Sequence, residues 1–69
     1  VSRPDRDELV SRAEALLDEL TDIDARLTQA EREGGLSAKA RVADLTSRRS
    51  YVLRTLAALE KAQRAMASA

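Results

Sequence analysis

The side chains in this sequence that could do chemistry are carboxylates and guanidinium groups. The acidic pairs Asp18/Asp22 and Asp22/Asp24 could bind a divalent ion weakly, but carboxylates at this spacing on an exposed helix are ordinarily solvated. Arg49 falls within a run of apolar spacing and has two interpretations. It either reaches the surface or pairs with an acidic residue of another helix and so fixes the register, or it binds an anion inside a helical bundle.

The residue types that support most catalytic and metal chemistry are missing. The sequence contains no His, Cys, Phe or Trp, and its one aromatic residue is Tyr51. Zinc sites, disulfides and thiol nucleophiles are therefore excluded. We expect no catalytic residue, no bound metal and no cofactor, and hence a protein that is not an enzyme.

The composition predicts one small helical domain over residues 1–69. Ala, Leu, Glu, Arg and Asp dominate the 69 residues, and most of them are good helix formers. No apolar run approaches the ~20 residues that a membrane span needs, and residues 1–20 have no secretory-signal pattern. We expect a cytoplasmic protein that does not contact a membrane.

Apolar spacing predicts a first helix over about residues 4–33. Pro4 suits a first turn, and Ser2 or Asp5 can cap it. Seven residues repeat at alternating steps of four and three, the pattern of a coiled-coil stripe. They are Leu9, Ala13, Leu16, Leu20, Ile23, Leu27 and Ala30.

The only two glycines, Gly34 and Gly35, predict the tip of a hairpin. Gly34 can end the first helix in the left-handed conformation, with Leu36 packing back on the last turn and Ser37 capping the next helix. This gives a turn over 34–36 and a second helix over about 37–67. Its stripe has the same spacing: Val42, Leu45, Arg49, Val52, Leu56, Leu59, Gln63 and Met66.

So short a turn requires the two helices to run antiparallel. The competing fold is one continuous helix through the glycines, at about 1 kcal/mol per glycine relative to alanine. The prediction is therefore an all-α, antiparallel two-helix hairpin.

Charge divides the chain at the same point. Residues 1–33 carry five Arg against ten Asp and Glu, a net charge of −5, whereas residues 34–69 carry seven Lys and Arg against two acidic residues, a net charge of +5. The two helices can neutralise each other when the chain folds back. Because the basic residues are also spread around their helix, we expect no nucleic-acid binding.

A second apolar face is expected from Val10, Leu17 and Leu53, which flank the two stripes. A chain of this size leaves about 40% of its unfolded surface exposed when it folds, so a lone hairpin is marginally stable. We expect Val10, Leu17 and Leu53 to close a homodimeric four-helix bundle, or to remain as a patch for another protein.

The stretch from Gln29 to Glu60 resembles the coiled-coil domain of the Gre-type transcript cleavage factors, which enter the secondary channel of bacterial RNA polymerase tip first. Tyr51 stands where that family often has Phe. The other matching residues are Ala30, Gly34, Leu36, Ser37, Ala40, Leu56, Leu59 and Glu60.

The resemblance implies docking on RNA polymerase without cleavage. In that family an aspartate and a glutamate at the tip hold the catalytic Mg²⁺, and here Gly35 and Ala38 take their places. A hairpin without these carboxylates cannot chelate the ion. The implied role is a regulator of transcription that occupies a channel or blocks a partner.

A third interpretation is an enzyme. The stretch Asp22–Leu27 resembles the opening helix of the all-helical chorismate mutases, and a dicarboxylate site would use Arg49 with Arg48, Arg54, Lys39 and Gln63. The chain lacks the third helix and the spaced set of basic residues that those enzymes require. The prediction that the residues favour is a non-catalytic interaction or assembly hairpin, with a Gre-like regulator as the alternative and the enzyme last.

Overall fold

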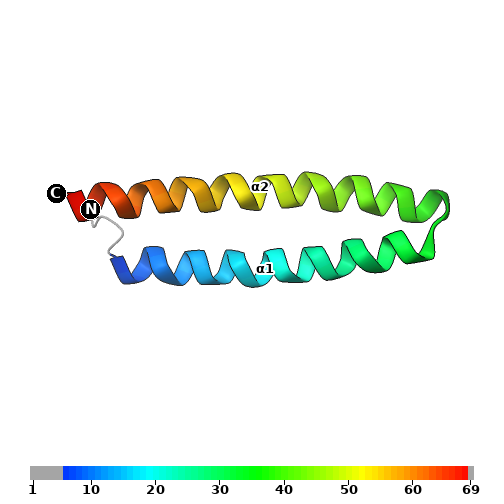
Figure 1. Ribbon diagram of the computed structural model, residues 1–69, viewed down its shortest axis with the longest axis horizontal. Coiled ribbons are helices and arrows are strands. Elements are labelled where there is room, and N and C mark those ends of the chain that lie inside the picture. Colours follow the sequence, from blue (N-terminus) through cyan, green and yellow to red (C-terminus); the bar gives the residue numbers. More distant parts are fainter. Residues whose placement is uncertain (1–5, 69) are drawn as a thin grey trace.

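The chain folds as a hairpin of two long helices in a computed structural model that describes residues 6–68. Helix α1 spans Arg6–Glu33 and helix α2 spans Gly35–Ser68. They lie side by side in opposite directions, joined at one end (Figure 1), in a rod of 51 × 21 × 15 Å. The predicted all-α antiparallel hairpin is confirmed, whereas its pairing into a four-helix bundle stays a prediction.

Two glycines turn the chain. Gly34 has a φ of +68° and Gly35 a φ of +87°, both in the region where a side chain is strained. The Gly34 N–H donates to the Ala30 carbonyl at 3.2 Å, which closes the last turn of α1. Because both φ angles are positive, the chain reverses with Gly34 alone between the helices.

This tight reversal corrects three predictions about the tip. Helix α2 begins at Gly35 and not at Ser37, so Ser37 lies inside the helix and does not cap it. Leu36 also lies inside α2, and its side chain is 86% exposed and does not pack back on α1.

The predicted start of the first helix at Pro4 and its caps Ser2 and Asp5 lie outside the described residues.

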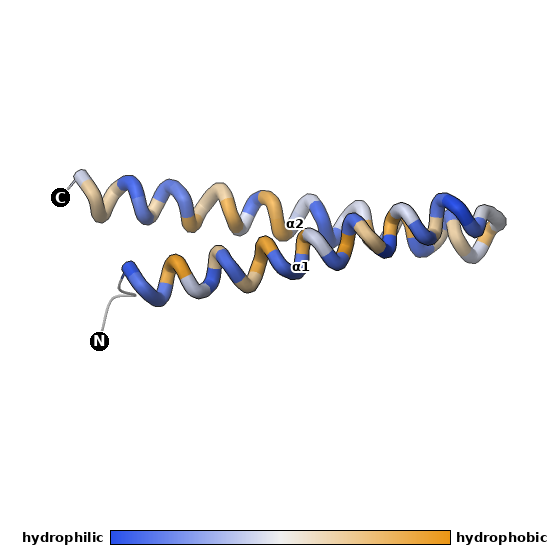
Figure 2. Tube along the Cα trace, turned by 60° about the horizontal axis from the view of Figure 1, so that its bottom comes forward, coloured by the Kyte–Doolittle hydropathy of each residue, from blue (hydrophilic) through white to orange (hydrophobic). Residues whose placement is uncertain are grey.

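The seam between the helices is narrow and apolar. Hydrophobic segments recur once per turn along α1 (Figure 2). Most other residues of the two predicted stripes are half-buried, because only one other helix covers each stripe. Within residues 6–68 the buried residues are Leu9, Ile23, Ala30, Ala38 and Val52.

The free end of the hairpin is less well covered. Helix α2 has 34 residues and α1 has 28, so the last turns of α2 extend past Arg6. Met66, predicted for the seam, lies there and is 43% exposed. Within the described residues 6–68, neither helix has a stretch long and apolar enough to pass through a membrane.

Candidate interaction surfaces

The hairpin has two sides that differ in chemistry. The seam residues of each helix alternate between two positions of the heptad. In an antiparallel helix pair, the residues that directly follow the first of these positions lie on one side of the hairpin, and the residues that directly precede the second lie on the opposite side. Val10, Leu17 and Leu53 directly follow the seam residues Leu9, Leu16 and Val52, and they define the apolar side. The ionic side is defined by Glu19, Arg41 and Arg48, which directly precede seam residues, and by Glu33, two heptads after Glu19.

The ionic side is satisfied within the chain. Glu19 of α1 forms an ion pair with Arg48 of α2, and Glu33 forms another with Arg41. Both pairs join the acidic helix to the basic helix, as the opposite charges of the two halves predict. They therefore hold the register of the helices.

Glu33 is the carboxylate most affected by its surroundings. The guanidinium of Arg41 donates a hydrogen bond to it, and the Gln29 amide nitrogen donates another at 3.2 Å. These donors lower the pKa of Glu33 from its usual 4.5, because they favour the charged form; the Arg41 hydrogen bond has the largest effect. Glu33 therefore carries a negative charge beside the tip and connects α1 to Arg41 of α2.

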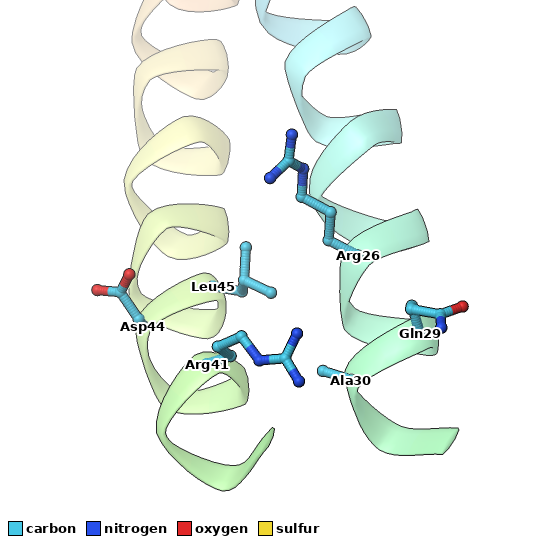
Figure 3. A pocket seen from close by; sticks show the side chains of 6 residues that line it. All are labelled: Arg26, Gln29, Ala30, Arg41, Asp44 and Leu45. Carbon is cyan, nitrogen blue, oxygen red and sulfur yellow. The ribbon is translucent and has the colours of Figure 1, made fainter. Parts of the chain in front are cut away.

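A shallow groove of about 270 Å³ lies on the ionic side. In Figure 3 the guanidinium groups of Arg26 and Arg41 reach into the space between the helices, and Asp44 points away from it. The two guanidinium groups already hold carboxylates, since Arg26 bonds Asp22 at 2.9 Å and Arg41 bonds Glu33. Both guanidinium groups that line the groove are therefore already neutralised by carboxylates of the same chain.

The apolar side is open. Val10 and Leu53 are each 39% exposed and Leu17 is 51% exposed. Leu17 lies two residues before Glu19, which pairs with Arg48, and seven residues before Asp24, which pairs with Arg49. Because the helices are antiparallel, the same steps taken forward along α2 place Leu17 level with residues 50–56. Leu17 and Leu53 therefore lie at the same height on the same side.

Arg49 marks the margin of this apolar side toward the tip. Its Nε donates to Asp24 Oδ1 at 2.8 Å, and the arginine is half-buried in the seam. Of the two interpretations of Arg49, the structure shows the ion pair with an acidic residue of α1. Because Asp24 directly follows the buried Ile23, this pair lies on the apolar side.

The residues suggested for a dicarboxylate site do not converge. Arg48 and Arg49 are engaged by different carboxylates of α1. Lys39 and Gln63 are both on α2, and at about 1.5 Å per residue they lie roughly 36 Å apart. Among residues 6–68 no three Asp or Glu side chains lie close enough together to hold a metal ion.

Comparisons with known proteins add no relative. No protein-family profile matches the chain, and neither a curated protein nor a solved structure matches it significantly. The surfaces must therefore be interpreted from their own chemistry.

The predicted tip residues form a blunt, open end. Gly34 and Gly35 line a second shallow groove with Ala38 and Lys39, and Leu36 projects beside it. Ser37 is exposed on the first turn of α2. Apart from Glu31 and Lys39, the groove offers no charged side chain, and its remaining lining is small and apolar.

Some residues of these surfaces were not singled out by the sequence analysis. Ala38 was not predicted to belong to the seam, although it is buried, lies four residues before Val42 and continues the stripe. Glu19, Asp24 and Glu33 were not predicted to be the carboxylates that pair with α2. The signal that would find them is the register counted outward from the glycines, which requires the length of the turn to be known.

Proposed function

We propose that this chain is a non-catalytic helical-hairpin module for protein interaction, and that it self-associates through its apolar side into a four-helix bundle. The observation that carries the proposal is the exposure of Val10, Leu17 and Leu53 at one side, while the opposite side forms its ion pairs within the chain. Large apolar side chains gathered at one place on a small surface favour a partner.

The energetics point in the same direction. Each helix covers only one stripe of its neighbour, so much of the seam is half-buried and few side chains contribute fully to stability. Burying apolar surface is worth roughly 25 cal/mol per Å², and a second hairpin would cover both the apolar side and the edge of the seam. Association would therefore stabilise the fold as well as join two copies.

Light scattering across a hundredfold range of concentration tests the proposal. We expect the mass of a dimer, and we expect Leu17→Glu with Leu53→Glu to give a helical monomer. The matched control is Ala25→Glu with Ala58→Glu, which adds the same charge at exposed positions away from the apolar side and should remain dimeric. A monomeric parent chain, or a dimeric Leu17/Leu53 variant, would reject self-association through this side.

A second candidate, favoured by the tip, is a Gre-like regulator that docks on RNA polymerase. Leu36 is 86% exposed at the end of a narrow rod, which suits insertion of the tip into a larger protein. Gly35 and Ala38 carry no carboxylate, so such a contact would not deliver a metal ion.

Retention on purified core RNA polymerase tests the second candidate. We expect Leu36→Asp to abolish retention if the tip docks, and Tyr51→Asp, at an exposed position far from the tip, to leave it unchanged. Equal retention of both variants would show that the tip is not involved.

A further inference from the structure

We propose that the two hairpins of the dimer align with their tips at the same end, so that α1 of one copy packs on α2 of the other. This arrangement rests on the proposed self-association and goes beyond it by naming the contacts. It follows from the distribution of charge on the apolar side, which differs between the two helices.

On α1 the charges of the apolar side are mostly negative, and Arg6, four residues before Val10, is the one basic residue among them within the described part of the helix. Asp7 and Glu14 lie three residues before Val10 and Leu17, on the same face of the helix, and Asp24 and Glu31 follow Leu17 by one and two heptads. On α2 the corresponding charges are mostly positive. Lys39 and Glu60 are two heptads before and one heptad after Leu53, while Arg49 lies four residues before it and Arg64 eleven after it. Arg64 lies 4.0 Å from Glu60 and Arg49 pairs with Asp24, so Lys39 is the basic residue of this set for which no ion pair within residues 6–68 is seen.

Only two symmetric arrangements bring the apolar sides face to face. A two-fold axis along the hairpin keeps the tips together and sets α1 against α2 of the second copy. A two-fold axis across the hairpin places the tips at opposite ends and sets α1 against α1. The first arrangement opposes unlike charges, and the second places two acidic faces in contact, which is repulsive.

The heights of the charges also fit the aligned arrangement. Counted from the ion pairs Glu19–Arg48 and Asp24–Arg49, Asp7 lies level with residues 60–66, which include Arg64 and its ion-pair partner Glu60, so this end contributes less than the end with Glu31 and Lys39. Glu31 lies within about one turn of Lys39 at the other end of the apolar residues. The second copy would therefore place a basic residue near an acidic one at each end, with Leu17 near Leu53 between them.

Distances between spin labels on Arg32→Cys test the alignment. The chain has no cysteine, and Arg32 is an exposed residue near the tip that is not on the apolar side. Aligned hairpins bring the two labels to about 30 Å, the width of the bundle with its labels. Opposed hairpins centred near Leu17 separate them by about 45 Å along the axis alone.

The outcomes separate the two proposals when mass is measured on the same labelled sample. A dimer with the short distance supports the alignment. A dimer with the long distance overturns the alignment and leaves self-association standing. A monomer overturns both. Adding Leu17→Glu and Leu53→Glu to the labelled chain should remove the short distance.

A charge exchange gives an independent test. Glu31→Lys and Lys39→Glu each place like charges near each other in their own homodimer, and we expect each to weaken association several-fold at low salt. A mixture of the two variants restores unlike contacts between copies in the aligned arrangement, so association should recover. No recovery on mixing would overturn the alignment, since the contacts within each chain are the same before and after mixing.

Discussion

The two sides of this hairpin flank the same seam, but the flanking residues are paired charges on one side and exposed apolar side chains on the other. On the ionic side, Glu19 and Glu33 of α1 reach across to Arg48 and Arg41 of α2. On the apolar side, Val10, Leu17 and Leu53 remain exposed. Long charged side chains can find their partners across one interface, whereas leucine and valine are covered only when another surface lies on them. The difference indicates which side is complete and which is available.

The seam lies between the ionic side and the apolar side, and substitutions in it are expected to reduce stability the most. Val52 is 0% exposed and Leu53, the next residue, is 39% exposed on the apolar side. Val52→Asp buries an unpaired charge and should cost roughly 3–5 kcal/mol, enough to remove most of the helical circular dichroism signal.

Leu53→Asp is the matched variant. It should keep the helical signal and reduce association at least tenfold, because its carboxylate stays in water within the monomer. Loss of the helical signal in both variants would mean that the apolar side is part of the core.

The tip is expected to give the next largest effect, since it aligns the two helices that form both sides. No side chain or other heavy atom would meet a Cβ at Gly34, so Gly34→Ala is penalised by its φ of +68° alone. We expect a loss of about 1–2 kcal/mol in the free energy of unfolding, measured in urea. Gly34→Asn should lose less, because asparagine tolerates this conformation, and an equal loss would point to a cause other than φ.

A smaller effect is expected from the ionic side. Removing one pair with Glu19→Gln should lower the free energy of unfolding by about 0.2–1 kcal/mol, since Arg48 is largely exposed. The difference from the parent chain should shrink at high salt, and the mass in solution should not change. A change of mass would show that the ionic side also carries an intermolecular contact.

The smallest effect is expected from the titration of Glu33. Its pKa is lowered in the folded chain by the Arg41 and Gln29 hydrogen bonds, so its contribution to stability is present above pH 4.5 and is lost as the pH falls through the lowered value. Thermal melts of Glu33→Gln and the parent chain should therefore differ at pH 7, begin to converge below pH 4.5, and coincide once the pH is below the lowered pKa of Glu33. A difference that persists there would exclude the ion pair as its cause.

The course of the helices could be predicted well, and the details of the tip could not. The spacing of Leu9 to Ala30 and of Val42 to Leu59 predicts the seam, because a helical repeat depends only on local geometry. Rules for a common helix end predict Leu36 in the turn and Ser37 as the cap that begins the second helix. Two consecutive positive φ angles shortened that turn to one residue, and nothing local in the sequence required both.

The candidate surfaces could also be predicted only in part. The sequence predicts that Arg49 either pairs with α1 or binds an anion, and the register decides for Asp24, 25 residues earlier. Val10, Leu17 and Leu53 can be identified as flanking residues from spacing alone. Their position at one height on one side follows only when the antiparallel register is known.

The helices, the turn at the two glycines and the division into an acidic and a basic segment could all be predicted before the structure, because these properties depend on composition and short-range spacing. The tertiary structure alone decided which carboxylate meets which guanidinium, which apolar side chains are covered, and how far α2 extends past α1. Those outcomes depend on the register and on the length of the turn, where a shift of one residue moves every flanking side chain relative to its partner.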